Sequence, residues 1–148
     1  MKPLDPDVES LLREWIDEAE ADLEAAEQLA PRAASRLGLR EIVGFHCQQA
    51  VEKYLKALLT RYQVEFPKTH DIERLLAIVS GVNREVADAL LAAKWLGPFG
   101  VDVRYPGDAA EVLPGDEMKA IDKSPAPPGT PCFASWTGHS PRQSRHER

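Results

Sequence analysis

Residues 44–59 read GFHCQQAVEKYLKALL, and this stretch decides the fold. Its apolar residues recur at the three- and four-residue spacing of an α-helix. One broad arc of the helical wheel collects the small and apolar side chains, which are Val43, Cys47, Ala50, Val51, Tyr54, Leu55, Ala57, Leu58 and Leu59. The pattern predicts a long helix from about Arg40 to Gln63 at the centre of a bundle, with the face of Ala50, Tyr54 and Leu58 buried.

The opposite arc of the same helix is polar and consists of His46, Gln49, Glu52, Lys53 and Lys56. Spacing alone favours a solvated face with weak ion pairs, such as Glu52 with Lys56. The alternative is a surface whose amide and ammonium donors, on successive turns, hold a phosphate or the edge of a nucleotide. Gln48 points toward the apolar arc instead. A buried amide needs hydrogen-bond partners, so we expect Gln48 to bridge neighbouring helices.

Another helix is predicted before this stretch. Asp5-Pro6 combines an N-cap acceptor with a proline whose φ suits the first helical turn. Apolar residues then recur at helical spacing to about Leu29, and Pro31 lies just beyond. Gly38 is expected in the loop that follows.

Three helices are predicted after the long one. Thr69 is expected to cap the third, which ends at Ser80-Gly81, and Asn83 is expected to cap the fourth. The Gly-Pro-Phe-Gly sequence of residues 97–100 should stop the fourth helix. An extended stretch over residues 101–107 then leads to a fifth helix that begins near Pro114 with acidic residues in its first turn. The predicted fold class is all-α, an up-and-down helical bundle of four full helices plus a truncated fifth.

Composition narrows the class of protein. The chain has 148 residues, 43% of them hydrophobic, which suits one domain with one core. A net charge of −6 argues against a general nucleic-acid coat, which would be basic. No apolar run of about eighteen residues is present, so we expect no membrane span. Cys47 and Cys132 form neither a disulfide framework nor a zinc site, and we expect a cytoplasmic protein without metal or cofactor.

The composition changes at residue 123. Proline, serine, glycine and arginine fill much of residues 123–148, and no apolar period survives there. Such a segment buries too little surface to offset the entropy lost on ordering. We therefore divide the chain into a helical domain over residues 1–122 and a disordered Pro/Ser/Arg-rich tail over residues 123–148.

Several blocks of the sequence, in chain order, resemble the HEPN domain, whose name stands for higher eukaryotes and prokaryotes nucleotide-binding. Residues 44–59 resemble its signature helix, and Trp15 with Ala19, Asp22 and Leu23 resembles its first helix. The start of its third helix is similar to residues 66–72, FPKTHDI, and its RYP segment is similar to Arg104-Tyr105-Pro106. Together the blocks cover about residues 8–121.

The resemblance implies a helical bundle that often dimerises. Many HEPN domains are encoded beside a minimal nucleotidyltransferase and are thought to help bind its substrate. The implied partners are therefore a second copy of the chain, a minimal nucleotidyltransferase and a nucleotide. The implied ligand- or partner-binding residues are Gln49, Glu52, Lys53, Lys56, His70, Asp71, Arg104 and Tyr105. Five of them, Gln49, Lys53, Lys56, His70 and Arg104, are expected around one shallow polar groove, where replacing both lysines by alanine should weaken binding with little loss of stability.

Other HEPN proteins are RNA-cleaving toxins that are neutralised by that partner. Their motif, an arginine followed after four to six residues by a histidine near the start of a late helix, cleaves RNA without a metal. No histidine follows Arg104 within six residues. Arg40 and His46 have the spacing, but they lie at the start of the second helix. A non-catalytic nucleotide- or substrate-binding module, with no catalytic residue, is thus favoured over a ribonuclease acting on RNA and over a purely structural dimerising bundle.

The fifth helix stops abruptly after Asp122, and two explanations are open. The tail is either a natural extension or the product of a frameshift near codon 122. We favour the frameshift because the apolar period ends in mid-helix rather than at a cap. Resequencing the gene tests this prediction, since a single-base shift there should open an amphipathic continuation of the helix. If neither alternative frame encodes apolar residues at helical spacing, the tail is an extension.

Overall fold

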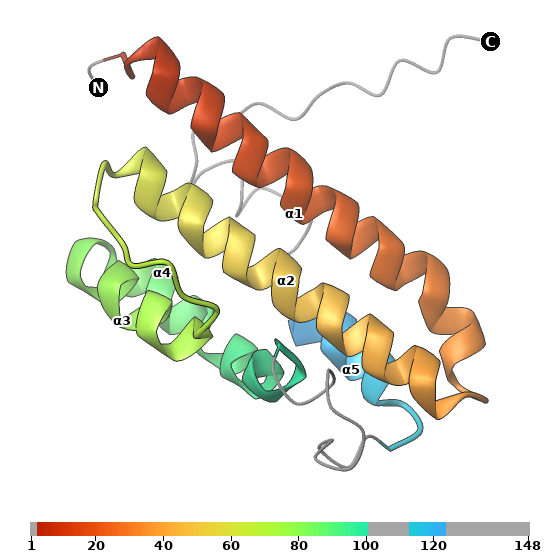
Figure 1. Ribbon diagram of the computed structural model, residues 1–148. Helices are drawn as coiled ribbons and strands as arrows, with labels where there is room; N and C mark the ends of the chain where they lie inside the picture. Colours follow the sequence, from red (N-terminus) through yellow and green to blue (C-terminus); the bar gives the residue numbers. More distant parts are fainter. Residues whose placement is uncertain (1–2, 101–112, 124–148) are drawn as a thin grey trace, which may run out of the picture.

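The computed structural model describes residues 3–100 and 113–123, and every regular element within them is helical. The all-α bundle is therefore confirmed (Figure 1). The predicted extended stretch over residues 101–107 and residues 124–148 of the predicted tail lie outside the described residues. The elements are α1 (Pro6–Ala33), α2 (Leu37–Arg61), α3 (Ile72–Val82), α4 (Arg84–Ala89), the 3₁₀-helix η1 (Leu91–Gly100) and α5 (Asp116–Lys123).

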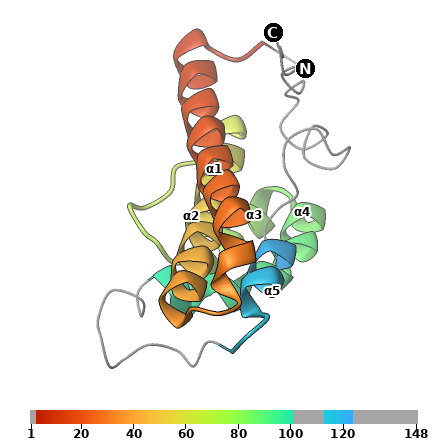
Figure 2. The ribbon, with the colours of Figure 1, turned by 90° about the vertical axis from the view of Figure 1, so that its right-hand side faces the viewer.

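Helix α2 is the central element and contacts α1, α3, η1 and α5. Figure 1 shows α1 lying along α2, and Figure 2 shows α3, α4 and α5 together on one side of this pair. Every residue of the predicted apolar arc is buried, with no more than 3% of its surface exposed. The prediction of a central helix with a buried Ala50, Tyr54 and Leu58 face is confirmed.

Small side chains allow α1 to pack closely on α2. Ala19 of α1 and Ala50 and Ala57 of α2 lie in one buried cluster with larger apolar residues of both helices. The Asp5 carboxylate accepts a hydrogen bond from the Asp7 backbone N–H at 2.9 Å, so the predicted N-cap of α1 is correct. The acceptor satisfies one of the backbone donors that every helix start leaves open.

The predicted end of α1 at Leu29 is wrong, because the helix continues through Pro31 to Ala33. A proline inside a helix removes one backbone hydrogen bond. Two features compensate for that loss. Ala30 and Ala33 are buried, and the Arg40 side chain donates to the backbone oxygens of Ala33 and Ala34 at 3.1 and 2.8 Å.

The boundaries of α2 also differ from the prediction of Arg40 to Gln63. The helix begins three residues earlier, so Gly38 lies in its first turn rather than in a loop. It ends at Arg61, and Gln63 has a positive φ of 54°. That left-handed conformation cannot continue a right-handed helix.

Asp71, and not Thr69, is the N-cap of α3. Its carboxylate accepts from the Arg74 backbone N–H at 3.2 Å. The Thr69 hydroxyl, two residues before Asp71, accepts from the Asp71 backbone N–H at 3.1 Å instead. Helix α3 also continues past the predicted stop at residues 80–81 to Val82. Asn83 caps α4 as predicted, because its side-chain oxygen accepts from the Val86 backbone N–H at 3.1 Å.

The predicted fourth helix is divided into two shorter elements. Helix α4 ends at Ala89, and the chain continues as η1 through residues 97–100, which were expected to stop it. A tighter 3₁₀ winding tolerates Pro98 in this segment and brings the Phe99 ring against α2 at Gly44. Gly100 lies close to the Gln48 side chain.

Helix α5 begins near the predicted place and carries Asp116 and Glu117 in its first turn, as expected. Gly115, with φ of 97°, makes the turn that precedes it. Glu117 is only 4% exposed, and its Oε2 lies 4.0 Å from Arg40 Nε. Arg40 thereby connects the end of α1, the start of α2 and α5.

Because Phe99 lies directly against Gly44, adding one methyl group at this position should lower the stability of the bundle. A Cβ at Gly44 would overlap three atoms of the Phe99 ring. Gly44→Ala should therefore lower the free energy of unfolding by about 1–3 kcal/mol, as overpacking of a core does. Urea denaturation followed by circular dichroism measures the change.

Gly81→Ala is the matched control, because Gly81 is also helical but has nothing within 4 Å of an added Cβ. It should be neutral or stabilise by up to about 1 kcal/mol, the helix propensity of alanine over glycine. Equal effects of the two substitutions would contradict the described packing of η1 on α2.

Candidate functional site

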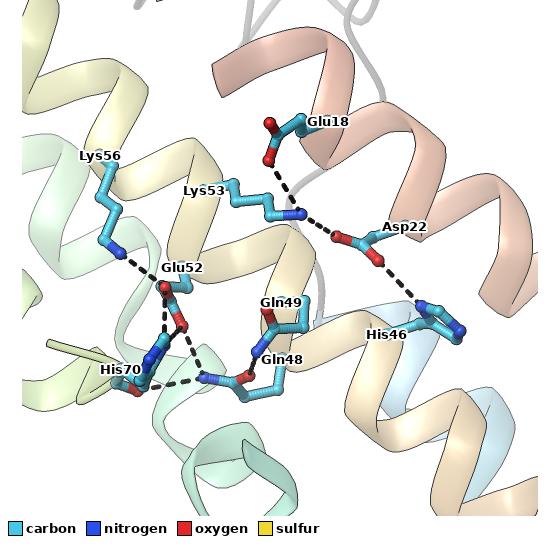
Figure 3. Close-up of polar contacts among 9 residues, drawn as sticks. All are labelled: Glu18, Asp22, His46, Gln48, Gln49, Glu52, Lys53, Lys56 and His70. Atoms are coloured by element: carbon cyan, nitrogen blue, oxygen red, sulfur yellow. Dashed lines mark hydrogen bonds and ion pairs between the residues drawn. The ribbon is translucent and has the colours of Figure 1, made fainter. Parts of the chain in front are cut away.

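The polar arc of α2 is largely covered and is not a solvated face. Glu52 is 2% exposed and Lys56 is 7% exposed, while His46, Gln49 and Lys53 are half-buried. The interpretation that spacing alone favoured is therefore wrong for Glu52 and Lys56. The reason is tertiary, since contacts from α1 and from residues 62–71, the α2–α3 connection, reach this arc (Figure 3). The polar side chains form two clusters.

The first, the Asp22 cluster, contains Glu18, Asp22, His46 and Lys53 and joins α1 to α2. Asp22 Oδ1 lies 2.8 Å from His46 Nδ1, and Asp22 Oδ2 accepts from Lys53 Nζ at 2.7 Å. Glu18 Oε2 lies 3.2 Å from the same ammonium. Since a carboxylate only accepts, His46 carries its Nδ1 proton toward Asp22, and Nε2 is the ring nitrogen left for other contacts.

Lys53 is held in its charged form. Partial burial disfavours the charge, but the hydrogen bond and charge of Asp22, together with those of Glu18, outweigh it and raise the pKa of Lys53 above its usual value. Burial also raises the pKa of the Tyr54 hydroxyl on the opposite face, with smaller contributions from Glu20 and Glu27. Both groups therefore keep their protons well into the alkaline range.

The second, the Glu52 cluster, contains Gln48, Gln49, Glu52, Lys56 and His70. Glu52 accepts from Lys56 Nζ at 2.6 Å, and His70 Nδ1 lies 3.1 Å from both carboxylate oxygens. Gln48 Nε2 lies 3.3 Å from Glu52 Oε2 and donates to the His70 backbone oxygen at 3.1 Å. The buried carboxylate thus has a partner on α2 and another on the α2–α3 connection.

Gln48 is fully buried and finds the partners that a buried amide requires. Besides its two donated hydrogen bonds, its oxygen accepts from Gln49 Nε2 at 2.7 Å. Its side chain also packs against Gly100, where an added Cβ would lie 2.7–3.0 Å from the amide atoms. Gln48 therefore bridges α2 to the α2–α3 connection and to η1.

The structure brings some of the predicted site residues together and separates others. Gln49, Lys56 and His70 meet through Gln48 and Glu52, as Figure 3 shows, whereas Lys53 turns toward α1. The remaining predicted residues are Asp71, whose side chain caps α3, and Arg104 and Tyr105, which lie outside the described residues.

The family model for the HEPN domain matches residues 12–123, about three quarters of the chain. The chain belongs to the HEPN domain family. The match spans α1 to α5 and includes both polar clusters. No curated protein and no solved structure matches the sequence.

In this HEPN domain, the sequence prediction missed the carboxylates of α1 as part of the site. Glu18 and Asp22 are four residues apart, so they lie on one face of α1. That spacing could have indicated the site, because two carboxylates on adjacent turns of one helix can pair with a lysine on the helix that packs against it. The prediction for α1 rested on its apolar residues and therefore described only the face that enters the core.

The clusters limit the chemistry of this HEPN domain. Each lysine of the polar arc already has a carboxylate partner, so an incoming phosphate would compete with Asp22, Glu18 or Glu52 for it. In the Glu52 cluster the accessible side chains are the half-buried Gln49 amide and the His70 ring, 65% exposed, and in the Asp22 cluster the His46 ring is 28% exposed. Residues 3–100 and 113–123 contain no group of three potential metal ligands. Over the same ranges, no helix is long and apolar enough to cross a membrane.

The two lysines should differ in their effect on stability, contrary to the expectation that both matter little. Lys56→Ala leaves the Glu52 carboxylate buried without its closest cation, so we predict a loss of about 3 kcal/mol in the free energy of unfolding. Lys53→Ala should cost less than about 1 kcal/mol, because Asp22 and Glu18 are more exposed and solvent can replace the ammonium. Chemical denaturation of both variants measures the two changes. Equal losses in the free energy of unfolding would contradict the difference in burial between the two clusters.

Lys53 also predicts a pH dependence. A raised folded-state pKa means that its stabilising contribution is fully present below the unfolded value of 10.5 and is lost as the pH rises through the folded value. The stability difference between the wild type and Lys53→Met should therefore be constant near neutral pH and shrink above about pH 10.5. Tyr54 titrates in both proteins, so it cancels in the difference. A difference that persists at the highest accessible pH would contradict the ion pair.

Proposed function

We propose that this chain is a non-catalytic HEPN binding module that works with a minimal nucleotidyltransferase and helps to bind its nucleotide or substrate. One observation carries the proposal. Arg40 and His46, whose spacing matches the ribonuclease motif, already form hydrogen bonds within the bundle. Arg40 is hydrogen-bonded to backbone oxygens at the end of α1, and His46 is hydrogen-bonded to Asp22 of α1. A second copy of the chain is part of the proposal, because HEPN domains often dimerise.

Arg40 has a structural task that conflicts with catalysis. Its guanidinium donates to Ala33 and Ala34 at the end of α1 and faces Glu117 of α5, and the side chain is only 11% exposed. A catalytic arginine must instead present its donors to a substrate phosphate. His46 is 28% exposed and is oriented by Asp22 of α1. These contacts support the binding module over the ribonuclease.

The composition of the Glu52 cluster favours a ligand that is recognised through hydrogen bonds rather than through an unpaired charge. Gln49 supplies an amide and His70 supplies a ring, while the Lys56 ammonium behind them is neutralised by Glu52. Amide and imidazole groups suit the edge of a base or polar side chains of a protein partner. The overall charge of −6 also disfavours a long polyanion such as RNA.

Co-purification with the minimal nucleotidyltransferase of the same genome tests the proposal, followed by ATP binding to the complex. Gln49→Ala should weaken partner or ATP binding by about fivefold, as loss of one interfacial hydrogen bond does. Lys94→Ala, an exposed lysine on η1, is the control and should bind like the wild type. Light scattering of the same samples gives the oligomeric state.

Two results would contradict this function. Wild-type binding by Gln49→Ala would remove the site. RNA cleavage by the purified chain, abolished by Arg40→Ala or His46→Ala, would make the protein a ribonuclease instead. The proposal predicts that RNA stays intact under the same conditions.

A further inference from the structure

The α2–α3 connection, residues 62–71, lies across the Glu52 cluster. In Figure 1 the chain leaves the end of α2 and runs back alongside that helix before α3 begins. Its first residues are tied to α2 by backbone hydrogen bonds, including the Val64 N–H to the Leu59 oxygen at 3.0 Å. Its last residues reach the middle of α2 at Gln48 and Glu52.

Polar contacts join the far end of this connection to α2. The His70 ring contacts the Glu52 carboxylate, and the His70 backbone oxygen accepts from Gln48. Phe66 adds an edge-on contact with Trp15 of α1, with ring centroids 6.5 Å apart. Val64 and Phe66 also pack against the apolar core. Local opening at His70 can leave that packing in place, so it costs less than unfolding of the bundle.

Lys56 lies in the innermost part of the cluster. Its side chain is 9% exposed, its Nζ is 2.6 Å from Glu52, and it lies 5.2 Å from the centre of the Trp15 ring. His70, which contacts the same carboxylate, is 65% exposed. An arriving ligand therefore meets His70 while the ammonium is still covered.

We propose that His70 is a latch, and that its release from Glu52 opens the α2–α3 connection and makes Lys56 accessible to an anionic group of the ligand. The inference rests on the proposed function only for the identity of that ligand. The latch itself follows from the contacts of His70. In the closed form Glu52 neutralises Lys56. In the open form the ammonium and the Gln49 amide face the same approach, and a phosphate competes with Glu52 for the exposed ammonium.

Lysine labelling with an amine-reactive ester, read by mass spectrometry on the free full-length chain, tests the latch. His70→Phe keeps a ring but removes the hydrogen bond, so Lys56 should be labelled about fivefold faster or more than in the wild type. His70→Gln retains a donor and should label close to the wild-type rate. Lys94, 43% exposed, serves as the internal reference for reagent activity.

His46→Phe is the matched control, because it makes the same chemical change at the Asp22 cluster and should leave Lys56 labelling unchanged. Circular dichroism shows whether each variant is folded, and His70→Leu, which also lacks a donor, replaces His70→Phe if the latter is not. Equal Lys56 labelling in the wild type and the latch variant overturns the latch. The latch is also overturned if His46→Phe raises the rate of Lys56 labelling as much as His70→Phe does.

ATP as a probe separates the latch from the proposed function. ATP should protect Lys56 from labelling in His70→Phe by about fivefold at saturation, because the phosphates occupy the exposed ammonium. Faster labelling without ATP protection would establish the latch and contradict nucleotide binding at this site. Slow labelling in every variant, together with ATP or partner binding, would overturn the latch and leave the binding module standing.

Discussion

A buried carboxylate, Glu52, is the constraint on which much of this structure depends. An isolated carboxylate in a protein interior is expensive, and it is tolerated only with close partners of opposite charge and further hydrogen bonds. Glu52 obtains both, from Lys56 one turn along α2, from Gln48 one turn back and from His70 on the α2–α3 connection. Meeting these needs fixes where the connection crosses α2 and hence where α3 begins.

Helix α2 is tied to its neighbours by three polar joints along its length, in addition to its apolar face. Arg40 joins its start to the end of α1 and to α5, and the Asp22 cluster joins its middle to α1. The Glu52 cluster joins the following turns to the α2–α3 connection. Hydrogen-bonded joints specify orientation more narrowly than apolar contact does, because they require particular atoms at particular distances.

The polar joints also explain how a conspicuously polar helix face can belong to the interior. Lys53 and Lys56 have the spacing of surface residues, yet each ammonium is oriented by a carboxylate within the domain. The surface that the Glu52 cluster leaves for a ligand is correspondingly small and centres on His70 and Gln49. Binding there and opening of the α2–α3 connection involve the same side chain.

The bundle and its core could be predicted from the sequence because they follow from periodicity. A buried face repeats at helical spacing whatever lies against it, so the apolar arc of α2 was identified residue by residue. Helix ends were predicted less well, since Arg40 closes α1 from a distance and Asp71 competes with Thr69 as a cap. Asn83, whose cap is local, was identified correctly.

The candidate site was only partly predictable for a related reason. A helical wheel shows which side chains share a face, but it does not show what covers that face. The pairing of Asp22 with both His46 and Lys53, and of Glu52 with His70, depends on how separate elements pack. Sequence reasoning therefore selected Lys56 as a site residue and misjudged its burial.

A double-mutant cycle between Glu52 and Lys56 tests the central claim most directly. The free energies of unfolding of Glu52→Gln, Lys56→Met and the double variant give the coupling between the two side chains. The buried pair described here predicts a coupling of about 2 kcal/mol or more, with the double variant losing clearly less than the sum of the single losses. Additivity within about 0.5 kcal/mol, as expected for a solvated surface pair, would contradict the account.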